Sequence, residues 1–588
     1  MSKSAVRFSI LLSFVLAPML SGNSSAQSGA DQKQESEKNR KTVYESATVL
    51  KAVSRLVVVD VVVTDKKGQP VTGLKATDFS VHEDGKPQSI RFFSFQGGNN
   101  SGSGAPPAPE ASVPRKLPNN VFTNVPDYKP GSAMNVILLD ALNSNLANQV
   151  YMREQLLKFI TGIPADRPTA IYALGSKLWL LQDFTTDPKT LQAVVANYKG
   201  GISNLLDNPT GAPPSDPYGM RFLPANIRER IKQFLKETIS QETELRVNQT
   251  MEALVALSRT LAAYPGRKNL IWLSEAFPLT IEPEVKQNSA MHAGNAQRNF
   301  GLQLTKAADA LMNAQIALYP IDIRGISSSD VFGANMGVNN FGESMITPAG
   351  MHREMGEFSD ELQAAHSTMN DLAERTGGKA FYNTNDFGKA VRSSMDDGST
   401  YYTLSYYPSD KNWNGKFRKI SLRVNSPDAK LRYRFGYFAI DPSSYQDRSA
   451  SVRAQDFGQT LNLDYPVSTA LMFRAGVMPP SEKTKNKVVV NYLVDAHAIR
   501  FQKEDDGLQH ATLSGAVQVY TEKGVPVKTE ATTITTALAP EIFRQVMERN
   551  LPLQMSFDLP PGKYILRLGI RDDRTGLIGS VNANVVVN

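Results

Sequence analysis

The sequence predicts an α/β protein with a doubly wound parallel sheet, flanked by an N-terminal small β domain and a C-terminal Ig-like β-sandwich. Three observations support this fold class. Apolar strand patterns alternate with helical spacing between residues 134 and 374, β-branched runs with turn signals fill residues 56–95, and beyond residue 450 the sequence returns to strand patterns. A chain of 588 residues is also too long for a single core.

Composition excludes several classes of protein. Apolar residues make up 41% and charged residues 21%, as in soluble globular domains. The net charge of +7 is spread along the chain, so we expect no nucleic-acid partner. Cysteine is absent, which excludes disulfides, a thiol nucleophile, a thiolate metal site and acylation as a lipoprotein.

Residues 1–26 are typical of a secretory signal peptide. Lys3 and Arg7 precede an apolar run at 8–20, and Ser24-Ser-Ala26 provides the small residues of a cleavage site. We therefore expect export to the periplasm or the extracellular space; an uncleaved N-terminal anchor is the alternative. No later segment has the roughly 20 unbroken apolar residues of a membrane helix, so no transmembrane segment is expected after cleavage.

The next part of the chain is predicted to be a spacer, a small β domain and a linker. Residues 27–45 are polar and favour a flexible spacer. Residues 46–96 form the small β domain, which includes an Asp-Gly turn and is short enough to need a neighbour to pack on. Residues 97–131 are rich in Gly and Ser and then in Pro, which indicates a linker.

Residues 132–440 are predicted to contain the parallel sheet. An apolar strand at 134–140 runs into Asp140 and a polar turn with Asn143 and Ser144, at the sheet edge where open α/β sheets bind ligands. Further strands are expected at 169–174, 177–181, 269–274, 315–322 and 379–382, and helices at 151–160, 188–198, 250–263 and 361–374. The segments 200–222 and 325–357 are expected to be long loops, the second near Asp140.

Antiparallel strands are predicted towards the end of the chain. Patterns of period two at 401–408, 418–424 and 431–438 indicate strands appended to the parallel sheet. Residues 451–588 are expected to form the β-sandwich. Its strands are expected at 488–494, 513–520, 553–558, 562–570 and 580–587, with a helix at 540–548.

The middle of the chain, from Met134 to Ala439, resembles a von Willebrand factor type A domain. The segments Gly266-Arg-Lys-Asn-Leu-Ile-Trp-Leu-Ser274, Leu318-Tyr-Pro-Ile-Asp-Ile-Arg-Gly325 and Val71-Thr-Gly-Leu-Lys-Ala-Thr-Asp-Phe-Ser-Val-His-Glu-Asp-Gly85 are similar to VWFA-related acidobacterial proteins. The resemblance implies a doubly wound type A (Rossmann-like) domain. It also implies a metal-ion-dependent adhesion site, in which an Asp-x-Ser-x-Ser turn is joined by a Thr and an Asp.

That site is degenerate in this sequence. The turn reads Asp140-Ala-Leu-Asn-Ser144, so Leu142 replaces the first Ser, and Glu275 stands near the place of the second carboxylate. The resemblance implies Asp140, Ser144 and Thr250 as ligands of Mg²⁺, or of Mn²⁺ or Ca²⁺. The alternative is that no metal binds, and that the turn side chains satisfy turn amides or bind a partner directly.

Enzyme motifs are absent from the sequence. Its six histidines lack HExxH spacing, and it has no Gly-x-Ser-x-Gly elbow and no phosphate-binding loop. Asp505-Asp506 precedes Gly507, which favours a hairpin turn over a calcium site. We therefore expect no enzyme; a hydrolase with an unrecognised site is the remaining enzyme hypothesis.

Two functions fit the sequence. The first is an exported adhesion-type protein that binds an unknown protein partner at the carboxyl edge of the sheet. Its partner-binding residues would be Asp140, Asn143, Ser144, Thr250 and Glu275. The second is a structural or scaffolding component of the cell envelope that has no metal-dependent binding.

Overall fold

The computed structural model describes residues 56–97, 117–126, 134–163, 167–200, 224–264, 266–275, 301–325, 348–426, 428–484 and 487–588. All of them belong to one compact unit, Glu45–Asn588. The expected signal peptide and spacer lie outside the described residues, as do most of the two expected long loops.

A sheet of five strands lies at the centre of the α/β part, in the order β10-β9-β6-β7-β8. The strands are β6 (Met134–Asp140), β7 (Thr169–Leu174), β8 (Leu178–Thr185), β9 (Lys268–Ser274) and β10 (Ile316–Asp322). The first four in this order are parallel, and β8 runs antiparallel to β7. Every residue of β6, β9 and β10 is buried, because helices cover both faces.

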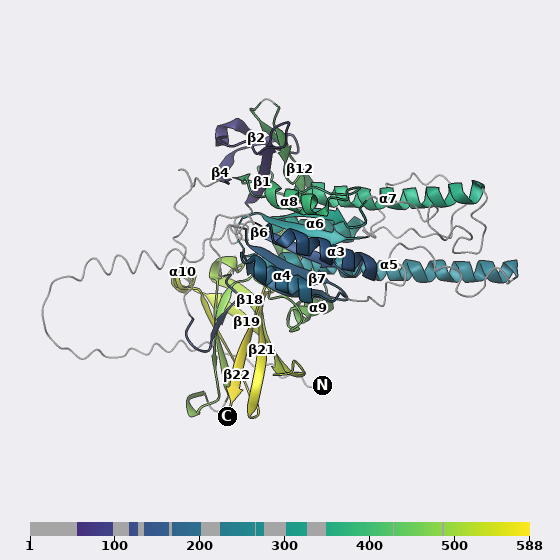
Figure 1. The fold of residues 1–588 in the computed structure, drawn as a ribbon. Helices are drawn as coiled ribbons and strands as arrows, with labels where there is room; N and C mark the ends of the chain where they lie inside the picture. Colours follow the sequence, from purple (N-terminus) through teal and green to yellow (C-terminus); the bar gives the residue numbers. More distant parts are fainter. Residues whose placement is uncertain are drawn as a thin grey trace. The chain divides into compact units, whose positions relative to one another are not determined.

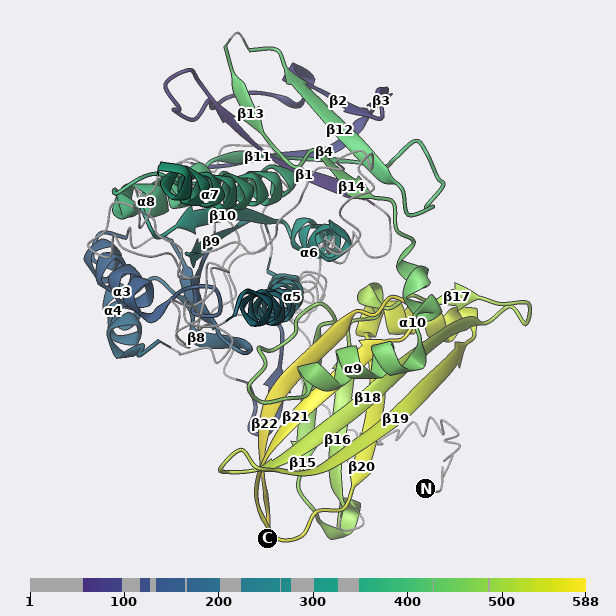
Figure 2. The ribbon, with the colours of Figure 1, turned by 90° about the vertical axis from the view of Figure 1, so that its right-hand side faces the viewer.

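Two helical layers enclose this sheet (Figures 1 and 2). The helices α3 (Leu146–Ile160), α4 (Pro188–Asn197) and α8 (Phe387–Asp397) contribute to one apolar core. The helices α5 (Ala225–Leu261), α6 (Gly301–Asn313) and α7 (Pro348–Thr376) contribute to the other. Strands and helices therefore alternate along the chain and in space, as the sequence pattern predicts.

Three helices begin earlier than the sequence predicts. α3 begins at Leu146 rather than at residue 151, α5 begins at Ala225 rather than near residue 250, and α7 begins at Pro348, inside the expected loop 325–357. The early parts of α5 and α7 do carry apolar residues at helical spacing among their polar residues, Ile227, Ile231 and Leu235 in α5 and Met351, Met355 and Phe358 in α7, so the signal for a longer helix is present in the sequence. Although α5 spans 37 residues, no helix in the described ranges is apolar enough to cross a membrane. The expected strand at 379–382 is reduced to a bridge between Phe381 and Ile321.

The strands at 401–438 complete the N-terminal β domain instead of extending the parallel sheet. The four N-terminal strands are β1 (Val57–Thr64), β2 (Phe79–Glu83), β3 (Lys86–Gln88) and β4 (Ile90–Gln96). Their partners are β11 (Tyr401–Tyr406), β12 (Phe417–Val424), β13 (Lys430–Arg432) and β14 (Gly436–Phe438). They form two sheets, β13-β1-β11-β4 and β14-β12-β2-β3, over one core. Period-two spacing identified these strands but carried no information about their partners.

The C-terminal part is a β-sandwich, two sheets around a shared core. One sheet has the order β20-β16-β15-β5, and the other contains β17, β18, β21 and β22, with β19 paired to β18. The strands are β5 (Val121–Thr123), β15 (Phe473–Met478), β16 (Val488–Val494), β17 (Gln502–Lys503), β18 (Gln509–Thr521), β19 (Pro526–Leu538), β20 (Leu551–Phe557), β21 (Gly562–Asp572) and β22 (Ile578–Val587). The helices of this part are α9 (Ala450–Thr460) and α10 (Pro540–Arg549), with short 3₁₀ helices at Pro442–Asp447, Glu482–Thr484 and Ala496–Ala498. Another 3₁₀ helix, Ala76–Asp78, lies between β1 and β2 of the N-terminal β domain. β5 comes from the expected linker, whose residues 121–123 are therefore part of the sandwich.

Candidate functional site

The structure brings together all five residues that the sequence proposes for partner binding. β6 ends at Asp140, and the turn that follows carries Asn143 and Ser144. β9 runs parallel beside β6 and places Glu275 just beyond its end, while α5 contributes Thr250. None of the five is more than 3% exposed. They therefore lie beneath the surface of the sheet edge.

Asp140 accepts hydrogen bonds on both carboxylate oxygens. Oδ1 accepts from the Asn143 backbone N–H at 2.9 Å. Oδ2 accepts from Asn143 Nδ2 at 3.0 Å and from Trp272 Nε1 at 2.9 Å. Burial raises the pKa of Asp140, and these hydrogen bonds, with one from the Ser274 side chain, oppose that rise. Trp272 was missed from the sequence, although a buried indole N–H in a central strand requires an acceptor.

The Asn143 amide connects the turn to α5. Its Nδ2 lies 3.0 Å from Asp140 Oδ2 and 3.0 Å from Thr250 Oγ1. Thr250 Oγ1 in turn donates to the Arg246 carbonyl at 2.8 Å. Leu142, at the position of the missing Ser, is fully buried in the core with α5, α6 and α7. One amide group therefore joins the carboxylate and the hydroxyl that the adhesion-site pattern assigns to a cation.

Ser144 and Glu275 connect β9 to the start of α3. The Glu275 backbone N–H donates to Ser144 Oγ at 3.0 Å. The Glu275 carboxylate accepts from the Asn145 backbone N–H at 2.7 Å and from Asn145 Nδ2 at 3.0 Å. Asn145 Oδ1 then caps α3 by accepting from the Asn148 N–H at 2.8 Å. Asn145, which the sequence did not single out, thus fixes the first turn of α3.

The described residues do not fit a divalent cation in this arrangement. Mg²⁺ and Ca²⁺ require several converging oxygen atoms. Between Asp140 and Thr250 lies an amide nitrogen, which donates hydrogen bonds and repels a cation. The described ranges also contain no group of three His, Asp or Glu side chains that could hold a metal. The buried Asn143 Oδ1 has no hydrogen-bond partner among the described residues.

A shallow pocket lies on the surface beside this network. It has about 190 Å³ of empty space and lies between α3 and the segment after α4. Its lining includes Leu146, Val150, Arg153, Tyr198 and Lys199. Leu146 is 48% and Val150 42% exposed. Much of this space is open to solvent, so the pocket is a shallow surface depression and is too small to enclose a small molecule, whose sites usually measure about 300–1,000 Å³.

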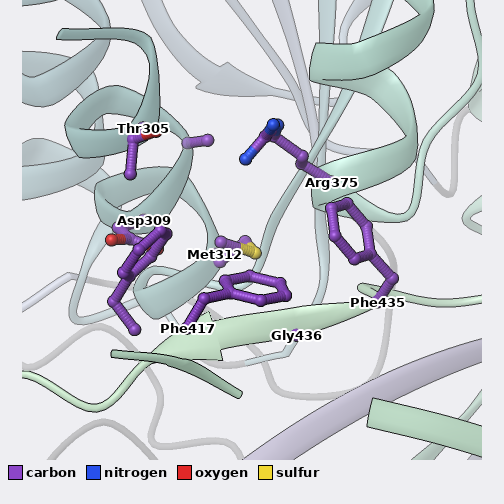
Figure 3. A pocket seen from close by; sticks show the side chains of 9 residues that line it. Thr305, Asp309, Met312, Arg375, Phe417, Phe435 and Gly436 are labelled. Carbon is purple, nitrogen blue, oxygen red and sulfur yellow. The ribbon is translucent and has the colours of Figure 1, made fainter. Parts of the chain in front are cut away.

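A second pocket lies between α6, α7 and the strands β12 and β14 (Figure 3). It has about 180 Å³ of empty space, and Asp309 and Arg375 lie in its wall. Burial raises the pKa of Asp309 to about 7, although the positive charges of Arg434 and Arg375 lower it. The Arg375 guanidinium lies 5.7 Å from the centre of the Phe435 ring. The small size again excludes a site for a whole metabolite.

Comparisons with known proteins found structural likenesses only. No protein-family model matches the chain, and no curated protein matches it. An aerotolerance-related membrane protein from Bacteroides fragilis is 12% identical over 45% of this chain and 98% of that chain, with a TM-score of 0.23. A von Willebrand factor type A protein from Catenulispora acidiphila is 10% identical over 56% of this chain and 73% of that chain, with a TM-score of 0.19. The PilB minor pilin from Streptococcus sanguinis is 10% identical over 46% of this chain and 61% of that chain, with a TM-score of 0.23. Because scores this low do not establish a shared fold, these likenesses carry no argument about fold or function.

Proposed function

We propose that this chain is an exported, adhesion-type protein that binds a protein partner at the carboxyl edge of its parallel sheet, without a cation. The observation that supports the metal-free part is the Asn143 amide, which lies 3.0 Å from both Asp140 Oδ2 and Thr250 Oγ1. An internal donor thus already satisfies the groups that a cation would join. The enzyme hypothesis gains no support from either small pocket.

In this proposal the partner contacts the shallow pocket between α3 and the segment after α4, hereafter the α3 pocket. The buried network holds α3, and with it the pocket, in place. Leu146 and Val150 supply exposed apolar surface at the first turns of α3, and Arg153 and Lys199 lie at the same pocket. This chemistry suits an apolar side chain of the partner with a carboxylate next to it. Glu275 and Asn145 hold the start of α3 in place through their hydrogen bonds, so the surface is formed before the partner arrives.

Site-specific photo-crosslinking tests the location of the contact. A benzophenone side chain at Val150, compared with one at exposed Lys158 two turns further along α3, should crosslink a partner in the producing cells. We expect one defined adduct from position 150 that persists in EDTA and disappears when Arg153→Glu is added. Equal adducts from both positions, or an adduct that EDTA abolishes, would contradict the proposal.

Calorimetry tests the absence of a cation independently of the partner. Mg²⁺, Mn²⁺ and Ca²⁺ are titrated into the full chain and into the Asp140→Ala variant. We expect no saturable heat that depends on Asp140. Saturable binding that the substitution removes would mean that the turn rearranges around a metal, and the metal-free mechanism would be wrong.

A scaffolding role in the cell envelope is the second candidate. It is favoured by the long exposed strand β19 at the edge of the C-terminal sandwich. Under this hypothesis the α/β domain is a packed spacer, so photo-crosslinks from Val150 should be absent while assembly through the β-sandwich persists.

A further inference from the structure

β19 is a long strand with one unpaired side. It contains 13 residues and pairs with β18 from Gln509↔Leu538 to Tyr520↔Pro526. Within the described part of the chain no strand pairs with its other side, and Figure 2 shows it at the margin of its sheet. Nine of its 13 residues are exposed. Its outer edge is therefore open to a further strand.

The second half of β19 lacks the features that normally protect such an edge. Proteins block exposed edges with charged residues or proline. The first half has both, because it begins at Pro526 and carries an ion pair of 2.6 Å between Lys528 and Glu530. The segment 531–537 reads Ala-Thr-Thr-Ile-Thr-Thr-Ala and has no charge and no proline. Four threonines and an isoleucine favour strand pairing.

This segment is symmetric about Ile534. If two copies paired antiparallel with the two-fold axis at Ile534, Ala531 would lie opposite Ala537, Thr532 opposite Thr536 and Thr533 opposite Thr535. Each pair joins residues of the same parity, so matching faces of the two strands stay on the same side. Every cross-strand pair then joins like with like, and Thr–Thr pairs stabilise antiparallel strands.

We propose that β19 is a self-association edge, at which a second copy of this chain adds its own β19 antiparallel and joins two sandwich sheets into one. A two-fold interface requires one surface to be complementary to itself, which the symmetry of 531–537 provides. An unrelated strand would not require that symmetry. The proposal does not depend on partner binding at the α3 pocket, and its variants lie in a different part of the chain.

Engineered cysteines test the register directly, because the chain has no cysteine of its own. Ala531→Cys and Ala537→Cys are both placed at exposed positions. Opposed Cα atoms in an antiparallel pair lie about 4.5–5.5 Å apart, within the range of a disulfide. A mixture of the two variants should form disulfide-linked dimers on mild oxidation. Either variant alone should not, because identical positions would lie about 20 Å apart along the strands.

Light scattering over a range of concentrations tests the association itself. We expect the full chain to form dimers, and Thr533→Lys with Thr535→Lys to weaken the dimer about tenfold or more, since lysines then lie opposite lysines. Val525→Lys with Val527→Lys adds the same charge outside the symmetric segment, at residues 57% and 48% exposed, and should leave the dimer intact. A chain that stays monomeric at every concentration overturns the proposal. So does a dimer that ignores the first pair of lysines, or one that crosslinks equally through Ala531→Cys alone.

Discussion

The carboxyl edge of the parallel sheet and the outer edge of β19 differ in how their polar groups are satisfied. At the sheet edge, Asp140, Asn143 and Thr250 are at most 1% exposed and bond to one another. At β19, most side chains are exposed and no strand among the described residues pairs with the outer side. The outer side of β19 therefore offers backbone hydrogen-bonding groups to a partner strand, whereas the buried side chains of the sheet edge are already bonded to one another.

This difference separates the residues that a motif identifies from the residues that a partner can reach. The adhesion-site pattern selects oxygen-bearing side chains, yet here they form an internal network that fixes the turn after β6. Under the proposed function, a partner would contact the neighbouring exposed residues, such as Leu146 and Val150. At β19 no motif is present, and the signal is the symmetry of the uncharged segment 531–537.

The largest expected effect tests whether the network at the sheet edge is closed. Asp140→Ala removes the acceptor of Trp272 Nε1 and of Asn143 Nδ2 and should lower the free energy of unfolding by about 3 kcal/mol. Urea unfolding followed by the fluorescence of Trp272, with Trp179 and Trp413 replaced by Phe, measures this change in the α/β domain. Asp505→Ala, at an exposed turn, is the matched control. Equal effects of the two substitutions would contradict the network.

A second substitution should turn the closed network into one that needs a cation. Asn143→Asp replaces the bridging amide with a carboxylate next to Asp140, and the repulsion should cost on the order of 2 kcal/mol. Millimolar Mg²⁺ should then raise the melting temperature of the variant, because a cation binds only its folded state. Asn143→Ala, which adds no charge, should not respond to Mg²⁺. If the unmodified chain responds as strongly as Asn143→Asp, the amide does not replace a metal.

Sequence patterns predicted local structure better than they predicted pairing. The strand at Met134–Asp140 was predicted with its observed bounds, because an apolar run bounded by a polar turn identifies a buried strand. The strands β11 and β12 were recognised as well, but not their pairing with β1 and β2, since spacing does not encode long-range partners. The first half of α5 was not predicted, although Ile227, Ile231 and Leu235 repeat there with helical spacing.

The sequence predicted where the candidate site lies, but not that its side chains are buried and bonded to one another. Asp140, Asn143, Ser144, Thr250 and Glu275 do lie together, because parallel strands end at one edge of the sheet. Their burial and the direction of the Asn143 amide depend on distances between segments more than 100 residues apart, which no local pattern contains. Trp272 and Asn145, which complete the network, were not among the predicted site residues, although Asn145 has the residue type preferred at a helix N-cap.

A pH experiment tests how much hydrogen-bond donors lower the pKa of a buried carboxylate, because a second buried carboxylate, Asp309, has fewer donors than Asp140 at the sheet edge. Asp140 has four opposing hydrogen bonds, whereas Asp309 relies on the charges of Arg434 and Arg375 and one backbone bond, and its pKa is about 7. Between about pH 4 and pH 7 folded Asp309 therefore holds a proton that the unfolded chain has lost, so stability falls as pH rises through this window.

Asp309→Asn should remove that part of the pH dependence and stabilise the protein at pH 8 by on the order of 2 kcal/mol. Urea unfolding at pH 5 and at pH 8, compared between the variant and the unmodified chain, measures the change. Asp371→Asn, at a less buried carboxylate in an ion pair on α7, is the control and should keep the original slope. An unchanged slope in Asp309→Asn would mean that this carboxyl group does not titrate near neutral pH.

The smallest expected effect lies at the boundary between the buried network and the exposed surface of α3. Glu275→Gln keeps one acceptor for Asn145 but turns an amide donor towards the other N–H, and should cost about 1 kcal/mol of stability. Glu154→Gln, at an exposed position of α3, should cost nothing measurable. Because Glu275 fixes the helix start, its substitution should also reduce photo-crosslinking from Val150 without making it sensitive to Mg²⁺. Full crosslinking in Glu275→Gln would show that the partner surface forms without help from the network, and the two would then be independent features of the same edge.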